Sequence, residues 1–217
     1  MKIFGLIASL FLTFSLIGQK SYYFSSSLPE GEASLTTVDK KWYGKYTIGT
    51  GNHVLEVNEG GIAMISTTIS SISREEIRES STYDVRNGYI FGVLQNDSLP
   101  CIMEEDRYFF GIRNKETIIG AGSKNVLCRS NRVANEFILN TYENGYYVPS
   151  TLLFENKNLT AKQLDYDFET TAFDFIQSKK SIQGTDLEII LLSPTKEELS
   201  TLLNTVFLIS NTYKKTR

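Results

Sequence analysis

The sequence predicts an all-β protein, an antiparallel barrel or sandwich built from hairpins, with a C-terminal α-helix packed on it. Three observations predict this class. From Trp42 to Leu192 the chain is rich in Tyr, Phe, Ile, Val and Thr, in short runs separated by turn residues. Two of these separators are Asn-Gly pairs, the strongest local signal for a β-hairpin. Clear helical spacing of apolar residues follows only after Ser193.

The first eighteen residues have the form of a secretory signal. Lys2 precedes a mainly apolar run, Ile3 to Ile17, that contains no charge and no proline. A transmembrane helix needs about 20 apolar residues, and Gln19 and Lys20 end this run earlier. We therefore expect cleavage near Gly18, no stable membrane span afterwards, and an extracytoplasmic location: periplasmic, cell-surface or secreted. An uncleaved N-terminal anchor is the alternative.

Cleavage would leave roughly 200 residues, enough for one domain of ordinary size. Residues 19–39 are polar and serine-rich, with Pro29 and Gly31 interrupting any regular element, and we expect an N-terminal arm there. An antiparallel β domain is expected over residues 40–193. A C-terminal helix and basic tail are expected over residues 194–217.

Within the β domain, the hairpins around Asn87-Gly88 and Asn144-Gly145 are the best-defined elements, because both residue types tolerate the positive φ of a type I′ turn. The other runs predict further short strands. The predicted strands cover residues 42–48, 53–57, 62–69, 81–85, 89–93, 101–104, 108–112, 117–119, 126–129, 137–142, 146–148, 152–155, 166–176 and 187–192.

Two helix starts are open after this β region. Either Ser193 caps the helix with Pro194 as its first residue, or Thr195 and Glu198 form a capping box. Leu199 and Leu202 begin a stripe at helical spacing, which favours packing of the helix onto the β domain. A helix that docks a partner is the alternative.

Charge and cysteine content exclude some classes of function. The chain has 22 basic and 25 acidic residues, which argues against a nucleic-acid partner. Cys101 and Cys128 are the only cysteines, and an oxidising compartment favours a disulfide between them over two buried thiols. A structural zinc site needs four ligands and the chain has one histidine, so we expect no metal and no cofactor.

Candidate catalytic groups are few. His53 is the only histidine and is expected in a turn, and the cluster Glu104–Asp106 is expected at a hairpin tip. Asp165, Asp167 and Glu169 alternate with aromatic residues, so a strand would place all three carboxylates on one face. Such a face is the basis for a hypothesis of a carboxylate-dependent hydrolase. The same alternation is typical of any half-buried strand, and a protein that is not an enzyme is favoured.

The layout from Trp42-Tyr43-Gly44 onward resembles the lipocalin-like or calycin group. The features in common are a first strand carrying this tryptophan, a series of antiparallel hairpins, and a helix after the last strand. The resemblance implies a closed barrel with an apolar interior.

We therefore expect an exported, non-catalytic binding protein. In one version a β-barrel holds a small apolar or amphipathic ligand. In the other, the chain is an accessory subunit of the cell envelope or of a secretion system and binds another protein through a strand edge or its C-terminal helix. An interior cavity would favour the first version, and a filled core with an open edge or exposed apolar helix face the second. The candidate ligand-binding residues are Trp42, Tyr46, Tyr89, Phe91, Phe109 and Tyr147.

Overall fold

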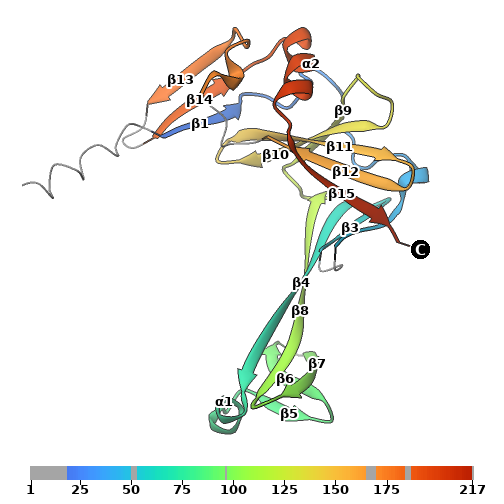
Figure 1. Ribbon diagram of the computed structural model, residues 1–217, viewed down its shortest axis with the longest axis vertical. Coiled ribbons are helices and arrows are strands. Elements are labelled where there is room, and N and C mark those ends of the chain that lie inside the picture. The colour runs from blue at the N-terminus through green and yellow to red at the C-terminus, as the bar shows by residue number, and fades with distance from the viewer. Residues whose placement is uncertain (1–18, 50–52, 96, 165–169, 184–186, 217) are drawn as a thin grey trace, which may run out of the picture. The chain divides into compact units, whose positions relative to one another are not determined.

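The computed structural model describes residues 19–49, 53–95, 97–164, 170–183 and 187–216. It confirms the predicted all-β class, with 57% of the described residues in strands and 12% in helices. The chain forms two compact units (Figure 1): unit 1 comprises residues up to Leu35 together with Lys124–Thr212, and unit 2 comprises Thr36–Ser123 together with the residues from Tyr213. The β region expected at 40–193 is therefore divided between two units. The expected signal, residues 1–18, lies outside the described residues.

Unit 1 is built on an open sheet. Its hydrogen-bonded order is β13-β14-β1-β11-β12-β15, and β10 and β9 continue from the side of β11. Because this order ends in edge strands, the closed barrel implied by the lipocalin-like resemblance is not formed. The strands are β1 (Gln19–Phe24), β9 (Val126–Arg129), β10 (Glu136–Glu143), β11 (Tyr146–Glu155), β12 (Asn158–Gln163), β13 (Lys179–Gln183), β14 (Leu187–Leu192) and β15 (Ile209–Lys215), whose last residues belong to unit 2.

Residues 19–39 differ from the expected polar arm. They begin with β1, which pairs in parallel with β14. Phe24 and Leu28 are fully buried in the core of unit 1. Asn140, itself inaccessible to solvent, accepts a hydrogen bond from the Leu28 N–H at 2.8 Å and donates one to the Leu28 carbonyl at 2.9 Å. This segment is therefore packed into unit 1, and the buried Asn140 side chain supplies the hydrogen-bond partners for the N–H and C=O groups of Leu28.

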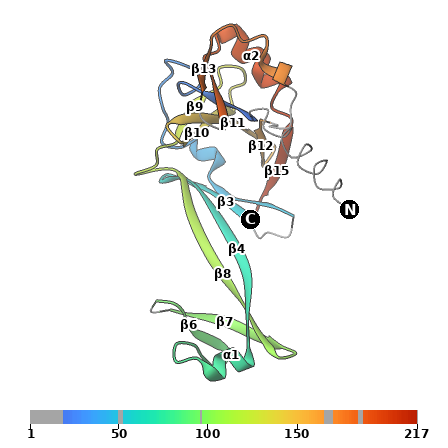
Figure 2. The same ribbon diagram turned by 90° about the vertical axis from the view of Figure 1, so that its left-hand side faces the viewer.

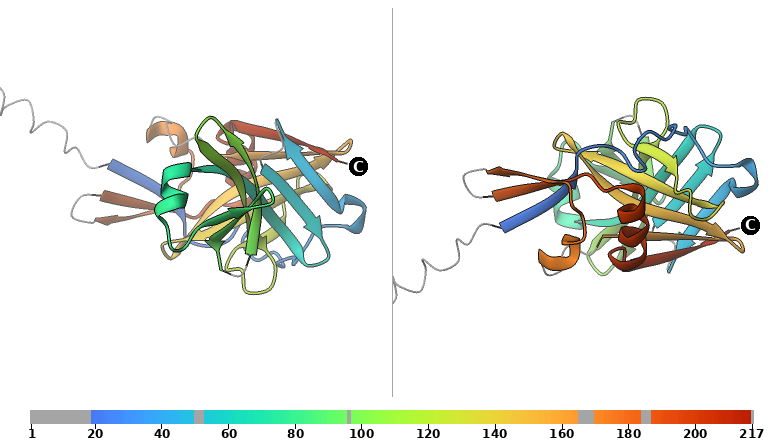
Figure 3. Two further views of the ribbon diagram at one scale, coloured as in Figure 1. Left: turned by 90° about the horizontal axis from the view of Figure 1, so that it is seen from below. Right: turned by 90° about the horizontal axis from the view of Figure 1, so that it is seen from above.

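The C-terminal helix, α2 (Lys196–Thr205), begins with a capping box, the second of the two predicted starts. The Glu198 carboxylate accepts from the Thr195 N–H at 2.8 Å, and the Thr195 hydroxyl accepts from the Glu198 N–H at 3.2 Å. The hydrogen bonds from the Thr195 and Gln177 backbones lower the pKa of Glu198. Leu199 and Leu202 are buried with Ile138 of β10, so the helix packs onto the sheet of unit 1 as expected (Figure 3, right).

Unit 2 has the order β15-β2-β3-β4-β8-β7-β6-β5. Two long strands of thirteen residues, β4 and β8, pair along their length, and α1, β5, β6 and β7 lie around their far end (Figures 1 and 2). We call β5, β6 and β7, with residues 67–73 and 107–113, the distal sheet. The elements are β2 (Gly44–Ile48), β3 (His53–Asn58), β4 (Gly61–Ser73), α1 (Arg74–Glu79), β5 (Asp84–Arg86), β6 (Tyr89–Leu94), β7 (Asp97–Glu104) and β8 (Arg107–Ile119).

Both Asn-Gly hairpins are confirmed. The turn between β5 and β6 has φ values of 53° at Asn87 and 78° at Gly88. The turn between β10 and β11 has φ values of 51° at Asn144 and 91° at Gly145. These are the left-handed conformations that a two-residue turn requires, so the local sequence set the register of both hairpins.

Several expected elements are different in the structure. Trp42 ends a short 3₁₀ turn, Lys40–Trp42, and does not start a strand. The two strands expected at 108–112 and 117–119 are one continuous strand, β8. In the strand expected at 166–176, residues 166–169 lie outside the described residues and Thr170–Phe173 form a 3₁₀ turn. The expected basic tail contains β15.

The structure describes both cysteines as free thiols, so it gives no support to the expected disulfide, which stays a prediction. Cys101 lies on β7 of unit 2, whereas Cys128 is fully buried on β9 of unit 1. Cys128 is therefore part of the packed interior of unit 1, whereas Cys101 is half-buried in unit 2. Burial raises the pKa of both thiols.

The hydrogen bonds of Asn140 predict a large cost for its removal. Asn140→Ala leaves the buried N–H and C=O of Leu28 without their partner, so we expect a loss of about 1–3 kcal/mol in the free energy of unfolding. Urea denaturation measures it. The exposed Asn211→Ala is the matched control, with an expected change below about 0.5 kcal/mol. Equal stability of the two variants would contradict this role of Asn140.

Candidate functional site

The six candidate ligand-binding residues divide between the two units, with Tyr147 in unit 1 and the other five in unit 2. Tyr46 is fully buried, and its hydroxyl donates to the Trp42 carbonyl at 2.6 Å. Tyr147 is in unit 1, where its ring packs edge-on against Tyr142 at 5.2 Å between centroids. The other three, on β6 and β8, belong to the distal sheet of unit 2. These three residues belong to one side of that sheet, whose composition is described next.

Cross-strand pairing places six apolar residues on one face of the distal sheet. Phe109 of β8 pairs with Ile102 of β7, and Ile69 of β4 pairs one rung away with Gly111. Pro100 precedes the partner of Phe110, so it lies level with Gly111, and it pairs with Tyr89 of β6. Paired residues project to the same side of a sheet and side chains alternate along each strand. Phe91 follows Tyr89 by two residues on β6 and projects to the same side. The residues that share this side, which we call the apolar face, are Ile69, Tyr89, Phe91, Pro100, Ile102 and Phe109.

The apolar face is open to solvent. Ile69 is 63% exposed, Ile102 69% and Tyr89 45%. The opposite side of the same sheet holds the buried residues Ile90 and Phe110, although Met103 at its end is also exposed. The sheet thus packs on one side only, and its second apolar side has no cover within the described part of unit 2.

Small neighbours explain the exposure of Ile69. Gly111, its partner across the strands, has no side chain, and a Cβ there would come within 3.3 Å of the Thr67 methyl group. The next residue of β4 on this side, Ser71, is also short. The Ile69 side chain therefore stands above its surroundings, where another surface can contact it.

Charged side chains border the apolar face. The Arg107 Nε donates to the Ser71 hydroxyl at 3.0 Å. The Arg86 guanidinium lies over the Phe91 ring at 4.4 Å and forms an ion pair with Asp84 at 3.5 Å. An apolar centre with aromatic residues and an arginine-containing polar rim is typical of protein–protein interfaces.

The strand edges are less suited to binding. The outer strand of the distal sheet, β5, has only three residues, and Asp84 and Arg86 on it are exposed. The outer strand β13 of unit 1 begins with exposed Lys179 and Lys180. Short edges and edge lysines hinder the addition of another strand. The apolar stripe of α2 is buried, so docking through that helix is not supported either.

The candidate catalytic groups are scattered. His53 is exposed at the start of β3, and Glu104–Asp106 lie exposed at the β7–β8 turn, as expected for a hairpin tip. The described residues contain no group of three or more His, Cys, Asp or Glu side chains that could hold a metal ion. Asp165, Asp167 and Glu169 lie outside the described residues, so the hydrolase hypothesis stays a prediction. Nor do the described ranges include a helix of the length and apolar character needed to cross a membrane.

Comparison of the chain with models of protein families, with curated proteins and with solved structures found no match. The interpretation of the site therefore depends on the chemistry of its own residues.

Substitutions on the two sides of the distal sheet are expected to change the free energy of unfolding by different amounts. Ile90→Ala removes a fully buried side chain and is expected to cost about 2–4 kcal/mol in the free energy of unfolding. Ile102→Ser, on the apolar face, is expected to change it by about 0.5 kcal/mol or less. Chemical denaturation measures both. A large loss for Ile102→Ser would mean that the face is covered within the monomer.

Proposed function

We propose that the chain is an exported, non-catalytic accessory protein that binds another protein through the apolar face of its distal sheet. The observation that carries this proposal is the contiguous exposure of Ile69, Ile102 and Tyr89 on one side of a sheet. Monomeric proteins expose single apolar residues freely, but a contiguous set with a polar rim marks an interaction site.

The size of the face fits a binding role. Full burial of one isoleucine side chain contributes about 1.5–3 kcal/mol, so Ile69 and Ile102 together offer a substantial part of the free energy of a protein complex. Tyr89 and Phe109 add rigid aromatic area of the kind that dominates such interfaces. The arginines of the rim fit a partner that surrounds an apolar patch with carboxylates or backbone carbonyls.

The open sheet weakens the alternative of a ligand enclosed in a barrel. A lipocalin-like site needs strands that close around an interior, and here the strand order ends in edges. Tyr46, one of the expected ligand contacts, is instead fully buried in the core, and its hydroxyl donates a hydrogen bond to a backbone carbonyl. A binding surface accounts for the exposed aromatic and aliphatic residues without requiring a closed interior.

The export part of the proposal rests on the N-terminal sequence. The apolar run after Lys2 has the form of a cleaved signal, and Gln19, the residue after the expected cleavage site, begins β1. A mature chain that starts there retains every strand described. Mass spectrometry of the protein from its native host is expected to give a chain beginning near Gln19 in an extracytoplasmic fraction. A full-length chain recovered from the cytosol would contradict export.

Site-directed photo-crosslinking in the native host tests the binding face. A photoreactive amino acid is placed at Ile102, and a matched one at Ile209, an exposed apolar residue of unit 1 that is outside the face. We expect one defined protein adduct from position 102, reduced when Ile69→Ser is added, and none from position 209. Adducts of the same pattern from both positions, or none from 102, would contradict the proposal. Circular dichroism confirms that each variant is folded.

A further inference from the structure

Unit 1 contains a pocket of about 270 Å³ between α2 and the loop that follows β9. Pro29, Leu199 and Leu203 form its apolar part, and Ser130, Arg132 and Lys196 line it with polar groups. The four lining residues from α2, including Ser200, follow the i, i+3, i+4, i+7 spacing of one side of a helix. A single helix therefore presents two of the apolar residues and a cation. The pocket includes no residue of the apolar face.

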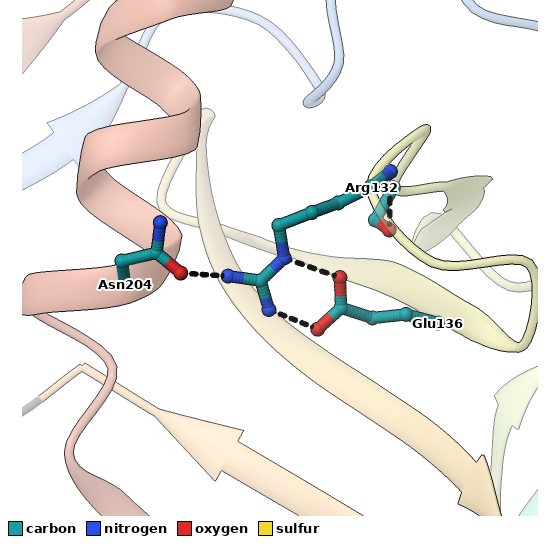
Figure 4. A network of polar contacts seen from close by, with 4 residues as sticks. Arg132, Glu136 and Asn204 are labelled. Atoms are coloured by element: carbon teal, nitrogen blue, oxygen red, sulfur yellow. Dashed lines mark hydrogen bonds and ion pairs between the residues drawn. The ribbon is translucent and has the colours of Figure 1, made fainter.

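The Arg132 guanidinium is held in place beside this pocket. Its Nε donates to one carboxylate oxygen of Glu136 at 3.0 Å, and its Nη2 donates to the other oxygen. Its Nη1 donates to the side-chain oxygen of Asn204 on α2 (Figure 4). Glu136 is 3% exposed and the arginine 26%. Because the planar guanidinium makes two parallel hydrogen bonds to a buried carboxylate, its rotation is restricted.

This arrangement leaves donors for a ligand. A guanidinium carries five N–H groups, and the bonds to Glu136 and Asn204 use three of them. Glu136 balances the charge of Arg132, so the positive charge of Lys196 remains to attract an anion, and no carboxylate is among the residues that line the pocket. Charge and shape together select a molecule with one anionic end and an apolar body.

We propose that this pocket binds a small amphipathic carboxylate. The carboxylate accepts hydrogen bonds from the Lys196 ammonium and from the remaining N–H groups of Arg132, and the aliphatic body packs on Pro29, Leu199 and Leu203. The volume of about 270 Å³ is slightly below the usual range of ligand pockets, about 300–1,000 Å³, which restricts the ligand to a small molecule. Glu136 and Asn204 act as positioning residues, because they fix the donor group without touching the ligand.

Titration of the full-length protein with octanoate, followed by calorimetry or by NMR chemical shifts, tests the proposal. We expect saturable binding in the micromolar to millimolar range. Octanol, which lacks the charge, is expected to bind about tenfold or more weakly, since hydrogen bonds to a charged group contribute more than neutral ones. A short peptide with an aliphatic last residue and a free C-terminus is the comparison for a carboxylate that belongs to a protein.

Variants of α2 locate the site. Ser200→Trp fills the pocket and is expected to abolish octanoate binding, whereas Thr201→Trp, one residue further around the helix and outside the lining, is expected to leave it unchanged. Both positions are exposed, so both variants are expected to fold. Lys196→Gln is expected to weaken binding about threefold to tenfold, and Lys180→Gln, an exposed lysine outside the pocket, is its control.

Four outcomes overturn the proposal. No saturable binding of octanoate, or equal binding of octanoate and octanol, rules out a carboxylate site. Binding that survives Ser200→Trp in a folded protein places the ligand elsewhere. Tighter binding of the peptide than of octanoate assigns the pocket to the C-terminus of a protein partner. None of these results bears on the crosslinking test at Ile102, so the two proposals fail independently.

Discussion

A sheet that is covered on one side only leaves its other side in solvent, and this constraint explains the distal sheet. Side chains alternate along β4, β7 and β8, so any strand with apolar residues at consecutive positions presents some of them to each side. Ile90 and Phe110 take the packed side, and Ile69 and Ile102 are left on the other. The exposed face is therefore a consequence of the architecture, and its apolar composition is the feature that points to a partner.

Unit 1 uses buried polar groups for different purposes. The Asn140 side chain makes the two hydrogen bonds to the Leu28 backbone that a neighbouring strand would otherwise make. The irregular segment around Leu28 can therefore be buried without leaving that N–H and C=O unpaired. Glu136 holds an arginine that also contacts α2. A buried ion pair adds little net stability compared with apolar packing, so the orientation that it gives to Arg132 is the more informative property.

Short-range features of the fold were predictable from the sequence, and long-range features were not. The Asn-Gly turns and the Thr195–Glu198 capping box depend on residues a few positions apart, so local chemistry determines them. β1 looks polar by itself and becomes a strand only because it pairs with β14, which lies far along the chain. The helix α1, which begins with a capping box of Ser73 and Glu76, was not predicted, and it lies between two strand-forming runs.

The candidate sites show the same limit. In β7, Cys101, Ile102 and Met103 are all apolar, so alternation alone does not say which side is covered, and only the pairing of β7 with β8 decides it. The pocket of unit 1 joins Pro29, Arg132 and Lys196, which are widely separated in the chain. No spacing rule connects such residues before the fold brings them together.

The parallel pairing of β1 with β14 also sets an order of assembly. Its two strands come from opposite ends of the chain, so unit 1 cannot complete its sheet until the C-terminal part has emerged. Most of unit 2 is one continuous stretch, Thr36–Ser123, whose contacts close over much shorter loops. A polypeptide threaded N-terminus first through a translocation channel would therefore form the distal sheet while the remainder is still being delivered.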